Sequence, residues 1–100
     1  MSKEEIKKAI LKNIQNNEFK DDIKSVSLFG SYIYNKETDD SDVDILITFH
    51  PQATVGFFKL AKIKKSLEDS IKRDVDLVTP EALSQYFKQD VINNVEQIYA

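Results

Sequence analysis

Residues 25–48 read SVSLFGSYIYNKETDDSDVDILIT and hold the features around which the rest of the chain is arranged. Two short apolar runs, VSLF and VDILI, lie at either end of a polar connection. Gly30-Ser31 ends the first run, and Asp42 and Asp44 begin the second. Alternate side chains of a strand point to the same face, so the two aspartates are expected to emerge together. If the runs pair as antiparallel strands, Gly30-Ser31 lies across a small gap from both carboxylates.

Paired carboxylates beside a glycine-serine turn are suited to binding a phosphate together with a metal ion. Such a turn, where it opens a helix, offers backbone N–H groups and a hydroxyl to phosphate. Aspartates supply the hard oxygen ligands that magnesium prefers, and the combination is typical of phosphoryl or nucleotidyl transfer. The plain alternative is a solvated strand face. Two carboxylates on one face repel each other, however, so a strand that begins with both is costly without a cation.

The spacing of these residues is itself a known pattern. Gly30-Ser31, ten intervening residues, and Asp42-Val43-Asp44 resemble the Gly-Ser-x10-Asp-x-Asp motif of the polymerase-β-type nucleotidyltransferases. The short chain and its later sequence VDLVTP resemble one branch in particular, the minimal nucleotidyltransferases, which are usually paired with a HEPN-domain toxin.

The resemblance implies roles for five residues in a two-metal reaction. Asp42 and Asp44 are implied to hold magnesium at the triphosphate, and Asp76 to bind the second ion and help deprotonate an attacking hydroxyl. Gly30 and Ser31 are implied to grip the terminal phosphates. Asp74 is expected to lie on the same strand face as Asp76, and only the resemblance selects Asp76.

The same resemblance implies ATP as donor, AMP as the transferred group and a tyrosine of a HEPN toxin as acceptor, which makes this chain an antitoxin. Relatives often carry a small residue, an arginine and a glycine where this chain has Ile33, Tyr34 and Asn35. That departure supports an alternative in which the chain masks its partner by contact alone. A second alternative is a small-molecule nucleotidyltransferase of the aminoglycoside-modifying kind.

Hydrophobic periodicity predicts an α+β fold, a single domain over residues 1–100 with a small mixed sheet flanked by helices. Isoleucines every four residues predict the first helix, and a Leu/Ile stripe extended by Phe57 predicts the second. A strand–helix–strand order favours parallel pairing of the last two strands, which gives a sheet of three strands. After Thr79-Pro80, the spacing of apolar residues as far as Val95 and Ile98 predicts a further helix. The expected helices are 2–17, about 55–72 and 80 onward; the expected strands are 26–29, 42–49 and 73–78.

Composition narrows the class of protein. Residues are 41% hydrophobic and 31% charged, which is typical of a globular domain rather than a disordered chain. The chain has no cysteine and no apolar run of membrane-spanning length, so a cytoplasmic location is expected. A formal net charge of −3 argues against a broad nucleic-acid-binding surface.

Overall fold

The computed structural model describes residues 2–30, 42–83 and 94–100. Its described elements are two α-helices, two 3-10 turns and four strands. In chain order they are α1 (Lys3–Gln15), η1 (Lys20–Asp22), β1 (Ile23–Phe29), β2 (Val43–Phe49), α2 (Phe57–Ile71), β3 (Val75–Val78), η3 (Pro80–Ala82) and β4 (Glu96–Tyr99).

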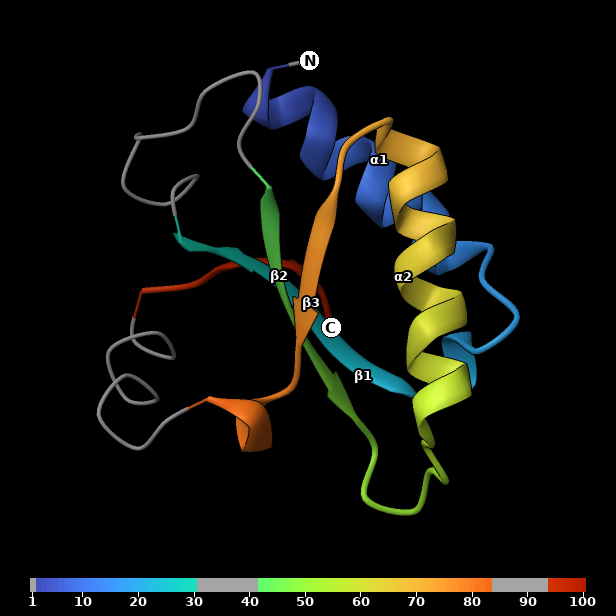
Figure 1. The fold of residues 1–100 in the computed structure, drawn as a ribbon. Helices are drawn as coiled ribbons and strands as arrows, with labels where there is room; N and C mark the ends of the chain where they lie inside the picture. The colour runs from blue at the N-terminus through green and yellow to red at the C-terminus, as the bar shows by residue number, and fades with distance from the viewer. Residues whose placement is uncertain (1, 31–41, 84–93) are drawn as a thin grey trace.

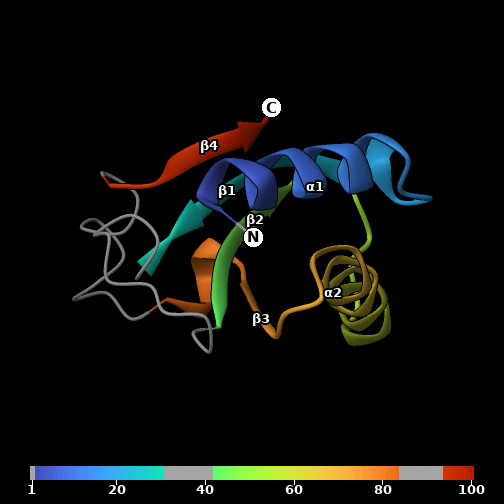
Figure 2. The same ribbon diagram turned by 90° about the horizontal axis from the view of Figure 1, so that it is seen from above.

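The strands form one mixed sheet in the order β3-β2-β1-β4 (Figure 1). β2 is antiparallel to β1 and parallel to β3, as the sequence predicts. Seen from above, α1 and α2 lie together on one side of the sheet (Figure 2). The expected α+β architecture, a small mixed sheet flanked by helices, is therefore confirmed.

The core lies between the two helices and one face of the sheet. Branched aliphatic side chains recur at the spacing that a helix or a strand needs to bury one side. The fully buried members of highest volume are Ile6, Ile10 and Ile14 of α1, Ile63, Leu67 and Ile71 of α2, and Ile23, Val26, Leu28, Ile45 and Ile47 of the sheet. The helices are also tied to each other, because the Asn13 side-chain amide donates to the Ser66 and Ser70 hydroxyls, each at 2.8 Å.

Helix boundaries follow local chemistry. Ser2 caps α1: its hydroxyl accepts from the Glu5 N–H, and its own N–H donates to the Glu5 carboxylate, both at 3.2 Å. α2 ends at Lys72, which adopts the left-handed conformation with φ 57°. The expected extension of the apolar stripe of α2 by Phe57 is wrong, since this side chain is 80% exposed at the first helical position.

The C-terminal region corrects the sequence-based prediction. Instead of a helix reaching Ile98, the chain forms β4, so the sheet has four strands rather than three. The outer edge of β1 offers unpaired backbone groups, and β4 satisfies them by antiparallel pairing. Pro80 starts only a 3-10 turn, and Leu83 is already extended at φ −80° and ψ 139°. The rest of the predicted helix, residues 84–93, lies outside the described residues.

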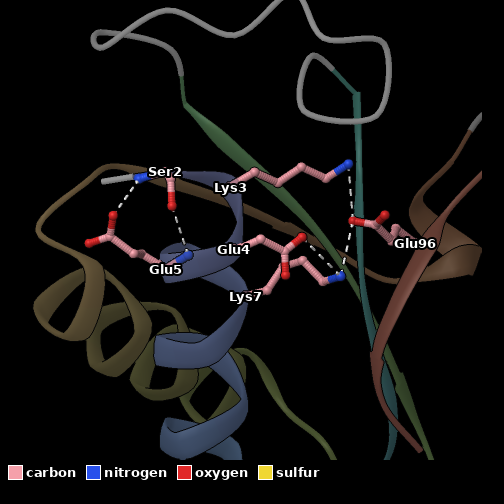
Figure 3. Close-up of polar contacts among 6 residues, drawn as sticks. All are labelled: Ser2, Lys3, Glu4, Glu5, Lys7 and Glu96. Atoms are coloured by element: carbon pink, nitrogen blue, oxygen red, sulfur yellow. Dashed lines mark hydrogen bonds and ion pairs between the residues drawn. The ribbon is translucent and has the colours of Figure 1, made fainter.

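β4 is joined to the first turn of α1 by an ion-pair network (Figure 3). The Glu96 carboxylate receives the Lys3 ammonium at 3.2 Å and the Lys7 ammonium at 3.4 Å. Burial raises the pKa of Glu96, but the two lysines outweigh this effect and the pKa lies below its ordinary value. The Glu96 Oε2 atom is buried and has no well-aligned hydrogen bond. Its short distances to both ammonium groups nevertheless indicate that its charge is compensated.

In the described ranges, neither helix is long and apolar enough to cross a membrane.

Candidate active site

The two halves of the glycine-serine and aspartate motif meet at one end of the β1–β2 pair. Phe29, the last residue of β1, is the register partner of Asp44. Gly30 follows with φ +72°, and a Cβ placed on it would collide with the Asp44 carboxylate, whose Cγ would lie 2.9 Å away. The turn therefore requires glycine at position 30 for two reasons: the backbone is left-handed there, and the Asp44 carboxylate occupies the space of a side chain.

Parallel pairing of β2 with β3 brings the third predicted carboxylate alongside. Asp44 and Asp76 are register partners, so their side chains leave the sheet on the same face at neighbouring positions. Their strand neighbours Val43 and Val75 point the other way and are buried in the helix-covered core. Asp44 is half-buried and Asp76 is exposed. The aspartates thus emerge on the sheet face opposite the two helices.

The remaining two motif residues are placed less fully. Asp42 is exposed and directly precedes β2, two positions from Asp44. Ser31 lies outside the described residues, as do Ile33, Tyr34 and Asn35. Of the five predicted site residues, the structure brings Gly30, Asp44 and Asp76 together and puts Asp42 at the entrance to the same strand.

The chemistry of the predicted ligands suits a magnesium ion, because all three are carboxylates. Within residues 2–30, 42–83 and 94–100, however, no three histidine, aspartate or glutamate side chains gather closely enough to hold a metal ion. The convergence of Asp42, Asp44 and Asp76 on one cation site therefore stays a prediction.

Asp76 and its rival, Asp74, lie at different points of the strand pairing. Asp74 precedes β3, and its backbone carbonyl accepts the Val43 N–H at 2.9 Å. It therefore joins the two strands through its main chain at the point where their pairing begins. Asp76, two residues further along, is the register partner of Asp44, whereas Asp74 shares its strand face but lies just outside β3.

A residue that sequence reasoning missed holds β3 in place. The Glu68 carboxylate of α2 accepts the Val75 N–H at 3.0 Å, so the helix fixes the first residue of the strand that carries Asp76. On the sequence, Glu68 is one of several charged residues on the polar side of a helix. Only the packing of α2 beside β3 gives it this role.

Three cavities are lined by residues of the described ranges alone. One of about 500 Å³ lies between α1 and α2 around Asn13 and Ser66. The other two, about 460 and 360 Å³, lie along α2. These three are lined neither by Gly30 nor by the aspartates, and in the described part of the chain the register of the strands brings the candidate residues together.

Comparison with known proteins settles the family. The sequence model described as "Polymerase beta, Nucleotidyltransferase" matches residues 4–100, nearly the whole chain. The chain belongs to the polymerase β nucleotidyltransferase family. This confirms the resemblance drawn from the motif and establishes the nucleotidyltransferase class of the fold.

Relatives within this nucleotidyltransferase family have similar length. The "Putative protein adenylyltransferase MJ0126" of Methanocaldococcus jannaschii is 33% identical over 88 residues, which cover 87% of this chain and 88% of the relative. "Protein adenylyltransferase MntA" of Thermococcus cleftensis is 30% identical over 73 residues, 73% of this chain and 72% of the relative.

Solved structures show the same fold in larger family members. A structure described as "Crystal structure of the toxin-antitoxin with AMP-PNP" superposes with a TM-score of 0.75 at 24% identity, covering 94% of this chain and 73% of the other. A tri-AMPylated Shewanella oneidensis HEPN toxin in complex with an MNT antitoxin superposes with a TM-score of 0.71 at 22% identity, covering 99% and 73%. At these identities the likeness establishes the shared fold.

Proposed function

We propose that this nucleotidyltransferase transfers AMP from ATP to a tyrosine of a HEPN-domain partner toxin and thereby acts as its antitoxin. The observation that carries the proposal is the contact of Gly30 with Asp44, with Asp76 in register beside it. The names of the relatives point to the same activity, since they are called protein adenylyltransferases. A HEPN toxin carrying AMP in a structure of the same fold supports the nature of the acceptor.

The proposal gives each of the five predicted site residues a role. Asp42 and Asp44 would hold one magnesium ion at the triphosphate, and Asp76 would hold a second. Bound magnesium supplies positive charge to the phosphates and lowers the pKa of the attacking hydroxyl. Gly30 leaves the backbone open to the terminal phosphates, and Ser31 adds its N–H and hydroxyl. Three neighbouring carboxylates are costly without such cations, which is why a divalent ion belongs in the proposal.

The transfer balances without any further reactant. The tyrosine oxygen forms a bond to the α-phosphorus of ATP, and the bond from that phosphorus to the bridging oxygen breaks. Pyrophosphate leaves, and Asp76 is the nearest candidate base for the hydroxyl proton. Asp44 is half-buried and Asp76 is exposed, so Asp76, which would hold the second ion and help take the proton, stays open to the acceptor.

Intact-mass analysis tests the proposal directly. The chain is incubated with ATP, magnesium and a HEPN-domain toxin, and the mass of the toxin is expected to rise in steps of one AMP. Asp44→Asn should lower the rate by about 100-fold or more, because a metal ligand contributes several kcal/mol to the transition state. Asp69→Asn, on the outer side of α2 beside Lys65, is the matched control and should transfer normally.

The same experiment discriminates between the alternatives. If Asp44→Asn neutralises the toxin as well as the parent does and no mass is gained, the chain acts by masking. If AMP is transferred to an added aminoglycoside but not to the HEPN protein, the chain is a small-molecule nucleotidyltransferase. Co-purification of Asp44→Asn with the toxin shows that a loss of transfer is not a loss of binding.

A further inference from the structure

Two adjacent phenylalanines are exposed at the start of α2. Phe57 is 80% exposed and Phe58 is 82% exposed, and their rings meet edge to face with centroids 6.0 Å apart. They are the large hydrophobic side chains most open to solvent in the part of the chain that the structure describes. Leaving two aromatic rings in water forfeits much of the stabilisation that their burial would give, so a paired exposure indicates a contact surface.

The pair borders two grooves of different depth and lining. The first, the strand-end groove, has about 460 Å³ and lies between the end of β2 and η3, with His50 and Glu81 in its wall. The second, the helix-flank groove, has about 360 Å³ and lies between α2 and Leu77 of β3. Phe57 lines both grooves, whereas Phe58, the next residue, lines neither and is exposed. The surface therefore offers an aromatic knob next to grooves large enough to receive one.

The two grooves carry opposite charge. Lys64, Lys65 and Glu68 line the helix-flank groove, so the lining has a net positive charge; the Glu68 carboxylate accepts the Val75 N–H, and Lys65 is paired with Asp69. Glu81 lines the strand-end groove. Within the described ranges, neither Lys64 nor Glu81 takes part in an ion pair with another residue of the chain. Acid and base thus flank Phe57 on opposite sides, which is the arrangement that a self-complementary surface requires.

We propose that this surface docks a second copy of the same chain. In a two-fold arrangement, Phe58 of each copy enters a groove of the other, and the Lys64 flank of one faces the Glu81 flank of the other. Four phenylalanine rings would bury roughly 600–1,000 Å². That is about half of the roughly 1,200–2,000 Å² found in stable interfaces, and the groove walls can supply the remainder.

The proposed dimer leaves the candidate active site free. Asp44 lies near the start of β2, whereas Phe57 follows the loop after the end of that strand. A strand of this length spans on the order of 20 Å, so Phe57 and the aspartates lie toward opposite ends of the sheet. Leu77, in the wall of the helix-flank groove, follows Asp76 in β3 but points to the opposite face, into the core. Figure 1 shows the start of α2 at the end of the molecule where β2 finishes. Each copy could therefore present its site to an acceptor independently of the other.

Sedimentation equilibrium of the purified chain tests this proposal. The parent is expected to approach twice its 11.5 kDa mass at concentrations on the order of 100 µM. Phe57→Ser with Phe58→Ser should weaken self-association at least about tenfold, because four aromatic rings are lost from the interface. Lys62→Ser, on α2 but at the cavity between the helices, is the control and should associate as the parent does.

A charge exchange separates a second copy from any other occupant. Lys64→Glu alone and Glu81→Lys alone should each weaken self-association. An equimolar mixture of these two single variants should recover it, because the exchanged charges then face each other. Circular dichroism of each variant verifies that it is folded. A parent that stays at 11.5 kDa throughout this range would overturn the proposal. The proposal is also wrong if the parent is monomeric and the phenylalanine variants no longer bind the HEPN protein, because the HEPN protein would then occupy this surface.

Discussion

At the scale of single residues, Gly30 does what no other residue type could do at its position. Its φ of +72° lies in the left-handed region, and its missing side chain leaves the space that the Asp44 carboxylate occupies. The glycine thus shapes the turn and sets the distance between the phosphate half and the carboxylate half of the motif.

Gly30→Ser should therefore damage both stability and activity. We expect the free energy of unfolding to fall by about 1–3 kcal/mol, because a left-handed conformation and a displaced carboxylate are both unfavourable. Gly56→Ser is the matched control: a Cβ there meets nothing within 4 Å, and serine is a good N-cap residue for α2. Urea unfolding of both variants checks the prediction, and equal loss in the two would contradict it.

Asp76 gives a second prediction at this scale. Because it lies in register beside Asp44, the two carboxylates repel each other when no cation is bound. Asp76→Asn should raise the stability of the metal-free protein by up to about 1 kcal/mol and abolish the increase in Tm that Mg-ATP gives the parent. Asp74→Asn is the control, since its main chain does the pairing. If Asp74→Asn rather than Asp76→Asn lost the Mg-ATP shift, the assignment of the third carboxylate would be wrong.

At the scale of elements, α1 depends on its first turn. The Ser2 N–H, which donates to the Glu5 carboxylate, holds the pKa of Glu5 below its ordinary value. This contribution to stability is complete above the ordinary carboxyl pKa of 4.5 and is lost as the pH falls through the lowered value.

Ser2→Ala should reduce the free energy of unfolding by about 0.5–2 kcal/mol at neutral pH, because the Glu5 N–H loses its acceptor. Ser2→Asp keeps an acceptor and a negative charge at the helix start, and should behave as the parent does. Thermal unfolding followed by circular dichroism measures both. Identical melting of Ser2→Ala and the parent would show that the cap does not contribute.

At the scale of the whole molecule, the two ends of the described chain are joined. Glu96 of β4 lies between Lys3 and Lys7 of α1, so the last strand is held by the first helix (Figure 3). The network also spans the edge at which β4 pairs with β1. Release of the carboxylate should therefore loosen β4 before it affects the core.

Glu96→Gln should speed hydrogen exchange in β4 and lower the free energy of unfolding by at most about 1 kcal/mol, since the pair is partly exposed and screened by salt. The pKa of Glu96 is lowered in the folded protein. The loss of stability caused by Glu96→Gln should therefore be complete above pH 4.5 and shrink as the pH falls through the lowered pKa. Asp69→Asn, which removes a more exposed pair with Lys65, is the control. Exchange in β4 that is unchanged in Glu96→Gln would contradict this role.

The sequence alone determined the motif, the first helix, the central strand pairs and the family. Those features depend on local patterns: isoleucines every four residues in α1, alternation in β2 and β3, and a fixed spacing from Gly30 to Asp44. Each pattern extends over enough residues, or is specific enough, to exclude other structures.

Only the tertiary structure decided the C-terminal strand, the exposure of Phe57 and the contacts of Glu68 and Glu96. β4 reads Glu-Gln-Ile-Tyr and lacks the apolar alternation of β3, and it forms because the edge of β1 offers it hydrogen bonds. Phe57 matches the apolar spacing of α2, yet it lies beyond the end of the core that the helix covers. Glu68 and Glu96 meet their partners across distant parts of the chain, and no local pattern encodes which surface charge will lie beside which backbone or lysine.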